Sequence, residues 1–160
     1  YWVPEWRLAE GPEEAMALVG APEFEPDRLC VVDASDAAGL TRIAAPDREI
    51  PPLLNRLSAN CTLRPVSAER VAIHVDAPAD GITVLADTYA PGWRARTDGV
   101  ATPILKVNGL FRGVVTPKGR HEIVFVYTPM SLRAGLIVCA VTAGIAGGML
   151  GYGRWRKRRL

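Results

Sequence analysis

The stretch LADTYAPGWRARTDGVATPILKVNGLFRGV, which runs from Leu85 to Val114, decides the fold. It contains Asp98-Gly99 and Asn108-Gly109, dipeptides typical of tight β-hairpin turns because Asp, Asn and Gly accept the positive φ angles that such turns need. Pro91-Gly92 marks a third turn. Short segments with strand character lie between the turns, over 93–97, 104–107 and 110–116. The stretch therefore predicts a series of short antiparallel strands.

Three more segments around this stretch also predict strands. Val71, Ile73 and Val75 alternate with Arg70, Ala72 and His74, which is the pattern of a half-buried strand. Apolar runs follow at 82–87 and 121–127. Short strands at roughly 10-residue spacing are typical of an antiparallel β-sandwich, which we expect over residues 66–130. The predicted fold class is therefore mainly β.

The chain before residue 66 predicts a different organisation. Tyr1–Ala9 is apolar enough for a strand at a sheet edge, and Gly11-Pro12 precedes a helix with an acidic first turn. Residues 28–33 read as a short buried strand. We therefore expect a small strand-helix-strand unit of α/β type over residues 1–33. Residues 34–65 mix Ala, Pro, Asp and Ser, and we expect them to form a linker or long connection.

A long uncharged run near the C-terminus predicts a transmembrane helix over residues 131–153. Twenty consecutive residues from Ala134 to Gly153 carry no charge, and at about 1.5 Å per residue they cover the roughly 30 Å hydrocarbon core. The alternative is a buried helix of a soluble domain, but such helices are usually shorter and keep a polar edge. Ala140, Gly144 and Gly148 recur at every fourth position, so we expect them to pack against another helix.

The charges are divided between two regions of the chain. Residues 1–130 contain 13 basic and 17 acidic residues, a net charge of 13 − 17 = −4, and residues 131–160 contain six basic residues and no acidic one. Basic residues beside an apolar run point to a membrane surface and not to nucleic acid. Five of the six follow the uncharged run, in the tail 154–160, so the C-terminus is predicted to be cytoplasmic and the large domain extracytoplasmic.

Three motifs together resemble the C-terminal region of the bacterial YfhO-family membrane proteins. They are LADTYAPGWRARTDG at 85–99, PILKVNGLFRGV at 103–114 and PKGRHEIVFVYTP at 117–129. The resemblance also covers 11–33, where PEFEPDR stands at 22–28, and it leaves out about 34–65. At Ala90 the resemblance leads us to expect a second aromatic residue beside Tyr89.

The resemblance implies a large polytopic protein of the GT-C glycosyltransferase type, with an external β-rich domain and a last membrane helix. Its catalytic groups, acidic residues on early external loops and a site for a polyprenyl-linked sugar donor, would lie upstream of this sequence. No export signal is visible near Tyr1, so we expect the chain to be a piece of a longer protein. No catalytic residue is assigned here. The implied partners are membrane lipid, upstream membrane helices and an envelope glycan.

Four residues are candidates for contact with a glycan. Aromatic faces and guanidinium groups suit sugar rings and their phosphates, which makes Tyr89, Trp93 and Arg94 a candidate platform. The alternative for Trp93 is that it fills the sandwich core. Alternation along a strand places Phe111 and Arg112 on opposite faces, so we expect Phe111 in the core and Arg112 on the surface.

Other chemistry finds little support in the sequence. Asp87 and Asp98 could pair as acid and base, but strand-end capping and hairpin geometry explain them. His74 and His121 lie far apart without a third ligand at metal spacing, so we expect no metal site. No nucleotide-binding or nucleophile motif occurs, and no cofactor is expected. Cys30 and Cys61 could pair only if the fold brought them together.

Two functional hypotheses remain. The first is an extracytoplasmic accessory domain, with the last membrane helix, of a glycosyltransferase-like membrane protein, where the domain positions an acceptor or stabilises the catalytic unit. The alternative is a single-span carbohydrate-binding or adhesion module without an enzymatic parent.

Overall fold

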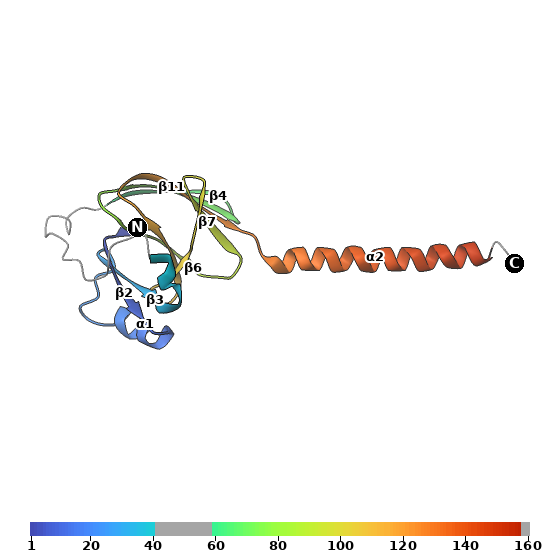
Figure 1. Ribbon diagram of the computed structural model, residues 1–160, viewed down its shortest axis with the longest axis horizontal. Helices are drawn as coiled ribbons and strands as arrows, with labels where there is room; N and C mark the ends of the chain where they lie inside the picture. Colours follow the sequence, from blue (N-terminus) through green and yellow to red (C-terminus); the bar gives the residue numbers. More distant parts are fainter. Residues whose placement is uncertain (41–58, 158–160) are drawn as a thin grey trace. The chain divides into compact units, whose positions relative to one another are not determined.

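The computed structural model describes residues 1–40 and 59–157, and the side chains of residues 65, 130–134 and 150–157 lie outside the description. The chain forms two units, residues 1–128 and 129–160, and each is described by itself (Figure 1). The first unit is mainly β and contains two sheets. The second contains one long helix, α2.

Each sheet is built largely from antiparallel neighbours. The six-stranded sheet has the order β1 (Trp2–Val3), β6 (Gly81–Thr88), β10 (Phe111–Thr116), β9 (Leu105–Val107), β3 (Leu29–Asp33) and β2 (Glu5–Ala9). The five-stranded sheet has the order β4 (Asn60–Ser67), β5 (Arg70–Ala77), β11 (Gly119–Tyr127), β7 (Trp93–Thr97) and β8 (Val100–Thr102). The predicted mainly β, antiparallel-rich fold is confirmed.

The main core lies between the two sheets because residues of alternate parity on each strand turn toward the other sheet. Ile73, Ile123 and Phe125 of the five-stranded sheet pack there with Trp2 and Val114 of the six-stranded sheet. The opposite face of the six-stranded sheet is also buried. Its cluster includes Val115 and Val107 together with Leu40 of the 3₁₀ helix η1 (Ala34–Leu40). Strand β10 is therefore covered on both faces.

The predicted strand-helix-strand unit is present but is not separate from the sandwich. Strands β2 and β3 are parallel, and α1 (Pro12–Val19) lies in the crossover connection that parallel neighbours need. Strand β1 pairs with β6, with Trp2 opposite Thr83, and β3 pairs with β9, with Val32 opposite Val107. The structure thus joins residues 1–33 to the predicted sandwich, because these pairings satisfy backbone groups that each part alone would leave open.

Strand β4 lies partly in the stretch for which we expected a linker. It pairs with β5 along its length and forms one edge of its sheet. Pro65 interrupts its apolar pattern, which is why the sequence does not read as a strand, but an edge strand tolerates proline. Residues 34–40 of the expected linker form η1, and residues 41–58 lie outside the described residues.

The two predicted hairpin dipeptides adopt the expected conformation. Asp98 and Asn108 have φ angles of 51°, and the glycines after them have φ angles of 80° and 70°. Asn108-Gly109 joins β9 to β10, as predicted. Asp98-Gly99 joins β7 to the short strand β8, which the sequence analysis does not anticipate.

Helix α2 (Met130–Lys157) covers the run for which we predicted a transmembrane helix. The side chains of residues 135–149 are all exposed within their unit. A search of the described residues found no helix with both the length and the apolar character needed to cross a membrane. Gly144 and Gly148 have open space beside their Cα atoms, so the packing predicted for Ala140, Gly144 and Gly148 stays a prediction.

Candidate functional site

Three of the four candidate glycan-contacting residues line one groove of the β-domain. Tyr89, Trp93 and Arg94 form part of its wall, and its volume is about 460 Å³. The lining also includes Thr102, the last residue of β8, and Pro103 and Ile104 from the connection between β8 and β9. Sequence reasoning missed these three because nothing local links them to residue 93. The groove is therefore a product of the tertiary fold.

The loop between β6 and β7 holds the groove residues in place. The backbone N–H of Tyr89 donates to the carbonyl of Leu110 at 2.7 Å, and the N–H of Thr128 donates to the carbonyl of Gly92 at 2.8 Å. Gly92 has a φ of 104°, a conformation that side-chain-bearing residues rarely adopt. These contacts fix the loop to the β9–β10 turn at one end and to the end of β11 at the other.

Trp93 both packs in the core and lines the groove. Its ring centroid lies 5.1 Å from that of Tyr127, and its side chain contacts the cluster between the sheets. It is half-buried and is one of the residues that line the groove. The two alternatives for Trp93 in the sequence analysis are therefore compatible.

Arg112 is not the surface residue that we expected. Its side chain is 0 % exposed and forms an ion pair with Asp87, whose side chain is 58 % exposed. Arg112 and Phe111 do lie on opposite faces of β10, as alternation predicts. Because both faces of this strand are covered, both residues pack inside the molecule. Burial lowers the pKa of Arg112, and the charge of Asp87 opposes that shift. Its Nε and Nη1 atoms have no hydrogen-bond partner within the described part of the chain.

The guanidinium of Arg112 lies behind the wall of the groove. Its central carbon is 3.8 Å from the centroid of the Trp93 ring and 5.7 Å from that of Phe125. Both rings favour a cation over their faces. Arg112 is therefore placed to support Trp93, whereas Tyr89, Trp93 and Arg94 line the groove.

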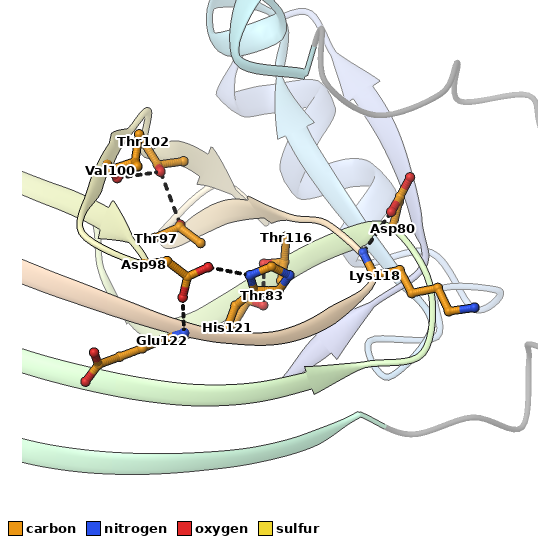
Figure 2. A network of polar contacts seen from close by, with 10 residues as sticks. All are labelled: Asp80, Thr83, Thr97, Asp98, Val100, Thr102, Thr116, Lys118, His121 and Glu122. Atoms are coloured by element: carbon orange, nitrogen blue, oxygen red, sulfur yellow. Dashed lines mark hydrogen bonds and ion pairs between the residues drawn. The ribbon is translucent and has the colours of Figure 1, made fainter.

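A second polar cluster surrounds His121 at another part of the domain (Figure 2). His121 Nδ1 lies 2.6 Å from Asp98 Oδ2, and the backbone N–H of Glu122 donates to Asp98 Oδ1 at 2.9 Å. The hydrogen bond from the Glu122 N–H lowers the pKa of Asp98 most, and the contact with His121 lowers it further. From the sequence, Asp87 and Asp98 could form an acid and base pair. In the structure Asp87 pairs with Arg112, whereas Asp98 belongs to the His121 cluster.

The structure brings together the two histidines that the sequence separates. His74 on β5 and His121 on β11 line the same hollow, of about 420 Å³, with Asp76, Arg120 and Glu122. The register pairs Glu122 with His74 and His121 with the next residue, Val75, and no local sequence signal reveals that register. Within residues 1–40 and 59–157, no group of three His, Cys, Asp or Glu side chains is arranged to hold a metal ion.

The cysteines are free. Cys30 is buried in the core of the six-stranded sheet, and burial raises its thiol pKa. Cys61 lies on β4 of the other sheet and is half-buried. The fold thus distributes the two thiols over different sheets.

Residues 46–139, more than half of the chain, match the family described as "Bacterial membrane protein YfhO". The chain belongs to the YfhO family. Its predicted resemblance is confirmed, although the matched region begins inside the stretch that we left out and does not include 11–33. The matched region contains the groove and the His121 cluster. Searches of curated proteins and of solved structures found no match.

Proposed function

We propose that residues 1–128 are the extracytoplasmic accessory domain of a YfhO-family membrane protein that acts as a glycosyltransferase of the GT-C type. In this proposal the domain holds an envelope glycan in the groove beside Trp93 and so positions the acceptor. The observation that carries the proposal is that Tyr89, Trp93 and Arg94 all line one groove.

The chemistry of the groove suits a sugar. An aromatic face packs against the apolar face of a pyranose ring, and a guanidinium donates several hydrogen bonds to hydroxyl, carboxylate or phosphate oxygens. Thr102 adds a hydroxyl to the lining, and Pro103 and Ile104 supply apolar surface. A groove with apolar walls and a few polar groups is typical of small-ligand sites.

The membrane location rests on the family and on the sequence of α2. The family is described as a membrane protein. The uncharged run covers residues 134–153, which is longer than the part of α2 whose side chains the structure describes, residues 135–149. Five basic residues follow the run and Arg133 precedes it, which supports a cytoplasmic C-terminus. A reporter fused after Leu160 should be active in the cytoplasm, and activity outside would overturn the extracytoplasmic assignment.

Binding of cell-envelope oligosaccharides to residues 1–128 tests the groove. Replacing Tyr89 by Ala or Arg94 by Gln should weaken binding about tenfold, the equivalent of about 1.4 kcal/mol. Arg7→Gln is the matched control, because Arg7 is an exposed arginine on β2 of the other sheet. A folded wild-type domain that binds none of the oligosaccharides would overturn the proposal. Equal binding by wild type and groove variants would contradict the groove.

The alternative of a single-span binding module makes a different prediction about the parent protein. It requires a parent whose upstream sequence lacks further apolar spans, whereas the accessory-domain proposal requires several. Reading the upstream coding sequence decides between them.

A further inference from the structure

Four arginines gather on the outer face of the five-stranded sheet. Inward residues such as Ile73, Ile123 and Ala95 pack in the core, so their neighbours along each strand point the other way. This outer face carries Arg64 on β4, Arg70 on β5, and Arg94 and Arg96 on β7, and β11 lies between β5 and β7. We call these four residues the arginine face.

The strand register makes the arginine face a compact cluster. Arg70 and Arg94 flank Val126 of β11 from its two sides. One row further along, Val124 has Ala72 on one side and Arg96 on the other, with Arg64 beyond Ala72. Adjacent strands lie about 4.8 Å apart, so the four Cα atoms surround a small apolar centre within roughly 15 Å.

These charges are poorly compensated. All four side chains are exposed, and within the described residues no ion pair involves any of them; Arg96 donates to the carbonyl of Gly99 at 3.0 Å. Glu69 is the acidic neighbour, in the turn before Arg70, and it is bonded to Ser67. On the same outer face, the row of residues after Ala72 and Val124 holds His74 and Glu122. His74 Nε2 lies 4.0 Å from Glu122 Oε1. Residues 1–130 carry a net charge of −4, so a basic face stands out against the rest of the domain.

The arginine face is at the end of the sheet from which the chain continues toward α2. Val126 precedes Thr128, the last residue of the β unit, by two positions. Five residues separate Thr128 from Ala134, where the uncharged run begins, and the six steps along the chain span at most about 20 Å. If α2 lies in the membrane as proposed, the lipid headgroups are within this reach of Thr128.

We propose that the arginine face binds the anionic headgroups of the membrane surface and so holds the β-domain against the bilayer. Arginine donates bidentate hydrogen bonds to phosphate, and a flat sheet face with basic residues around an apolar centre matches a flat, anionic surface. This inference depends on the proposed membrane location of α2 but not on glycan binding in the groove.

Vesicle co-sedimentation tests the proposal with residues 1–128, which contain all three described core clusters. The domain should sediment with vesicles of phosphatidylcholine mixed with phosphatidylglycerol and not with phosphatidylcholine alone, and added salt should weaken the binding. The double variant Arg64→Gln/Arg70→Gln should bind roughly thirtyfold more weakly, because each basic residue near such a surface contributes about a fivefold factor. This variant leaves Tyr89, Trp93 and Arg94 intact, so glycan binding should not change.

The matched control is Arg7→Gln/Lys118→Gln, which removes the same charge from exposed positions outside the arginine face. Circular dichroism shows whether each variant is folded. An equal loss of vesicle binding in the control would overturn the proposal in favour of general charge attraction. Absence of vesicle binding by the folded wild type would also overturn it, as would binding to an acidic polysaccharide in place of vesicles. Loss of glycan binding with vesicle binding retained would contradict the proposed groove instead.

Discussion

The guanidinium carbon of Arg112 lies 3.8 Å from the centroid of the Trp93 ring, so a buried cation lies directly behind the aromatic wall of the groove. The ionic partner of that cation, Asp87, is more than half exposed. The stability of the groove wall is thus linked to a carboxylate at the surface. This relationship leads to the first prediction.

Replacing Asp87 by Asn should destabilise the domain far more than a change at an exposed site usually does. The substitution leaves the buried Arg112 without a counter-charge, and we expect a loss of about 2–3 kcal/mol in the free energy of unfolding. The double variant Asp87→Asn/Arg112→Met should recover most of the loss, because Met fills similar space without a charge. Urea denaturation of residues 1–128 measures both. A loss below about 0.5 kcal/mol in the single variant would show that the ion pair is unimportant.

The Asp98 cluster should make the domain sensitive to acid. The pKa of Asp98 is lowered from its ordinary value of 3.8, so its contribution to stability is complete above that value and disappears as the pH falls through the lower pKa of the folded state. Asp98→Asn keeps a residue that tolerates the positive φ but cannot titrate. Between about pH 5 and about pH 2.5, the melting temperature should fall more steeply in the wild type than in the variant. Parallel curves would contradict the role of Asp98.

Asn108 should matter more than its place in a turn suggests. Its Oδ1 accepts a buried hydrogen bond from the backbone N–H of Val31 at 2.8 Å, and its own backbone N–H donates to the carbonyl of Val31 at 2.7 Å. Asn108→Ala removes the first bond, leaves a buried donor unpaired and places Ala at a φ of 51°. We expect a loss of about 2–4 kcal/mol.

The matched control for that change is Asn108→Gly, which removes the same side chain but accepts a φ of 51° without strain. It should cost nearly as much as Asn108→Ala, because it leaves the same buried N–H of Val31 unpaired. Chemical denaturation of the two variants gives the comparison. A Gly variant as stable as the wild type would show that backbone strain, and not the bond to Val31, governs the Asn108 site.

Gly144 of α2 should tolerate a large side chain poorly in the full-length parent protein. Small residues allow membrane helices to approach closely, and Leu at this position would separate them. Gly144→Leu should therefore lower the melting temperature in detergent, while Ala146→Leu, about half a turn away, should change it less. A loss that varies with protein concentration would indicate a homodimer instead, and no loss would remove Gly144 from any contact.

The candidate groove shows how far sequence reasoning reaches in this chain. Tyr89, Trp93 and Arg94 are close in sequence, so a single loop brings them together and residue type alone makes them candidates. Thr102 and Ile104 complete the groove through the pairing of β7 with β8, which depends on a strand that the sequence analysis does not anticipate. Arg112 could not be placed correctly, because alternation states which face a residue occupies but not whether that face is covered.

By itself the sequence determined the features that depend on near neighbours. The hairpin turns at Asp98 and Asn108 follow from dipeptides that accept positive φ, and most strands follow from apolar periodicity. The tertiary structure alone decided the pairing of β1 with β6, the hollow that both His74 and His121 line, and the gathering of the four arginines. Each of these depends on the register between strands far apart in the chain. That register is set by the packing of the whole core, because a shift of one residue would move every core side chain to the other face.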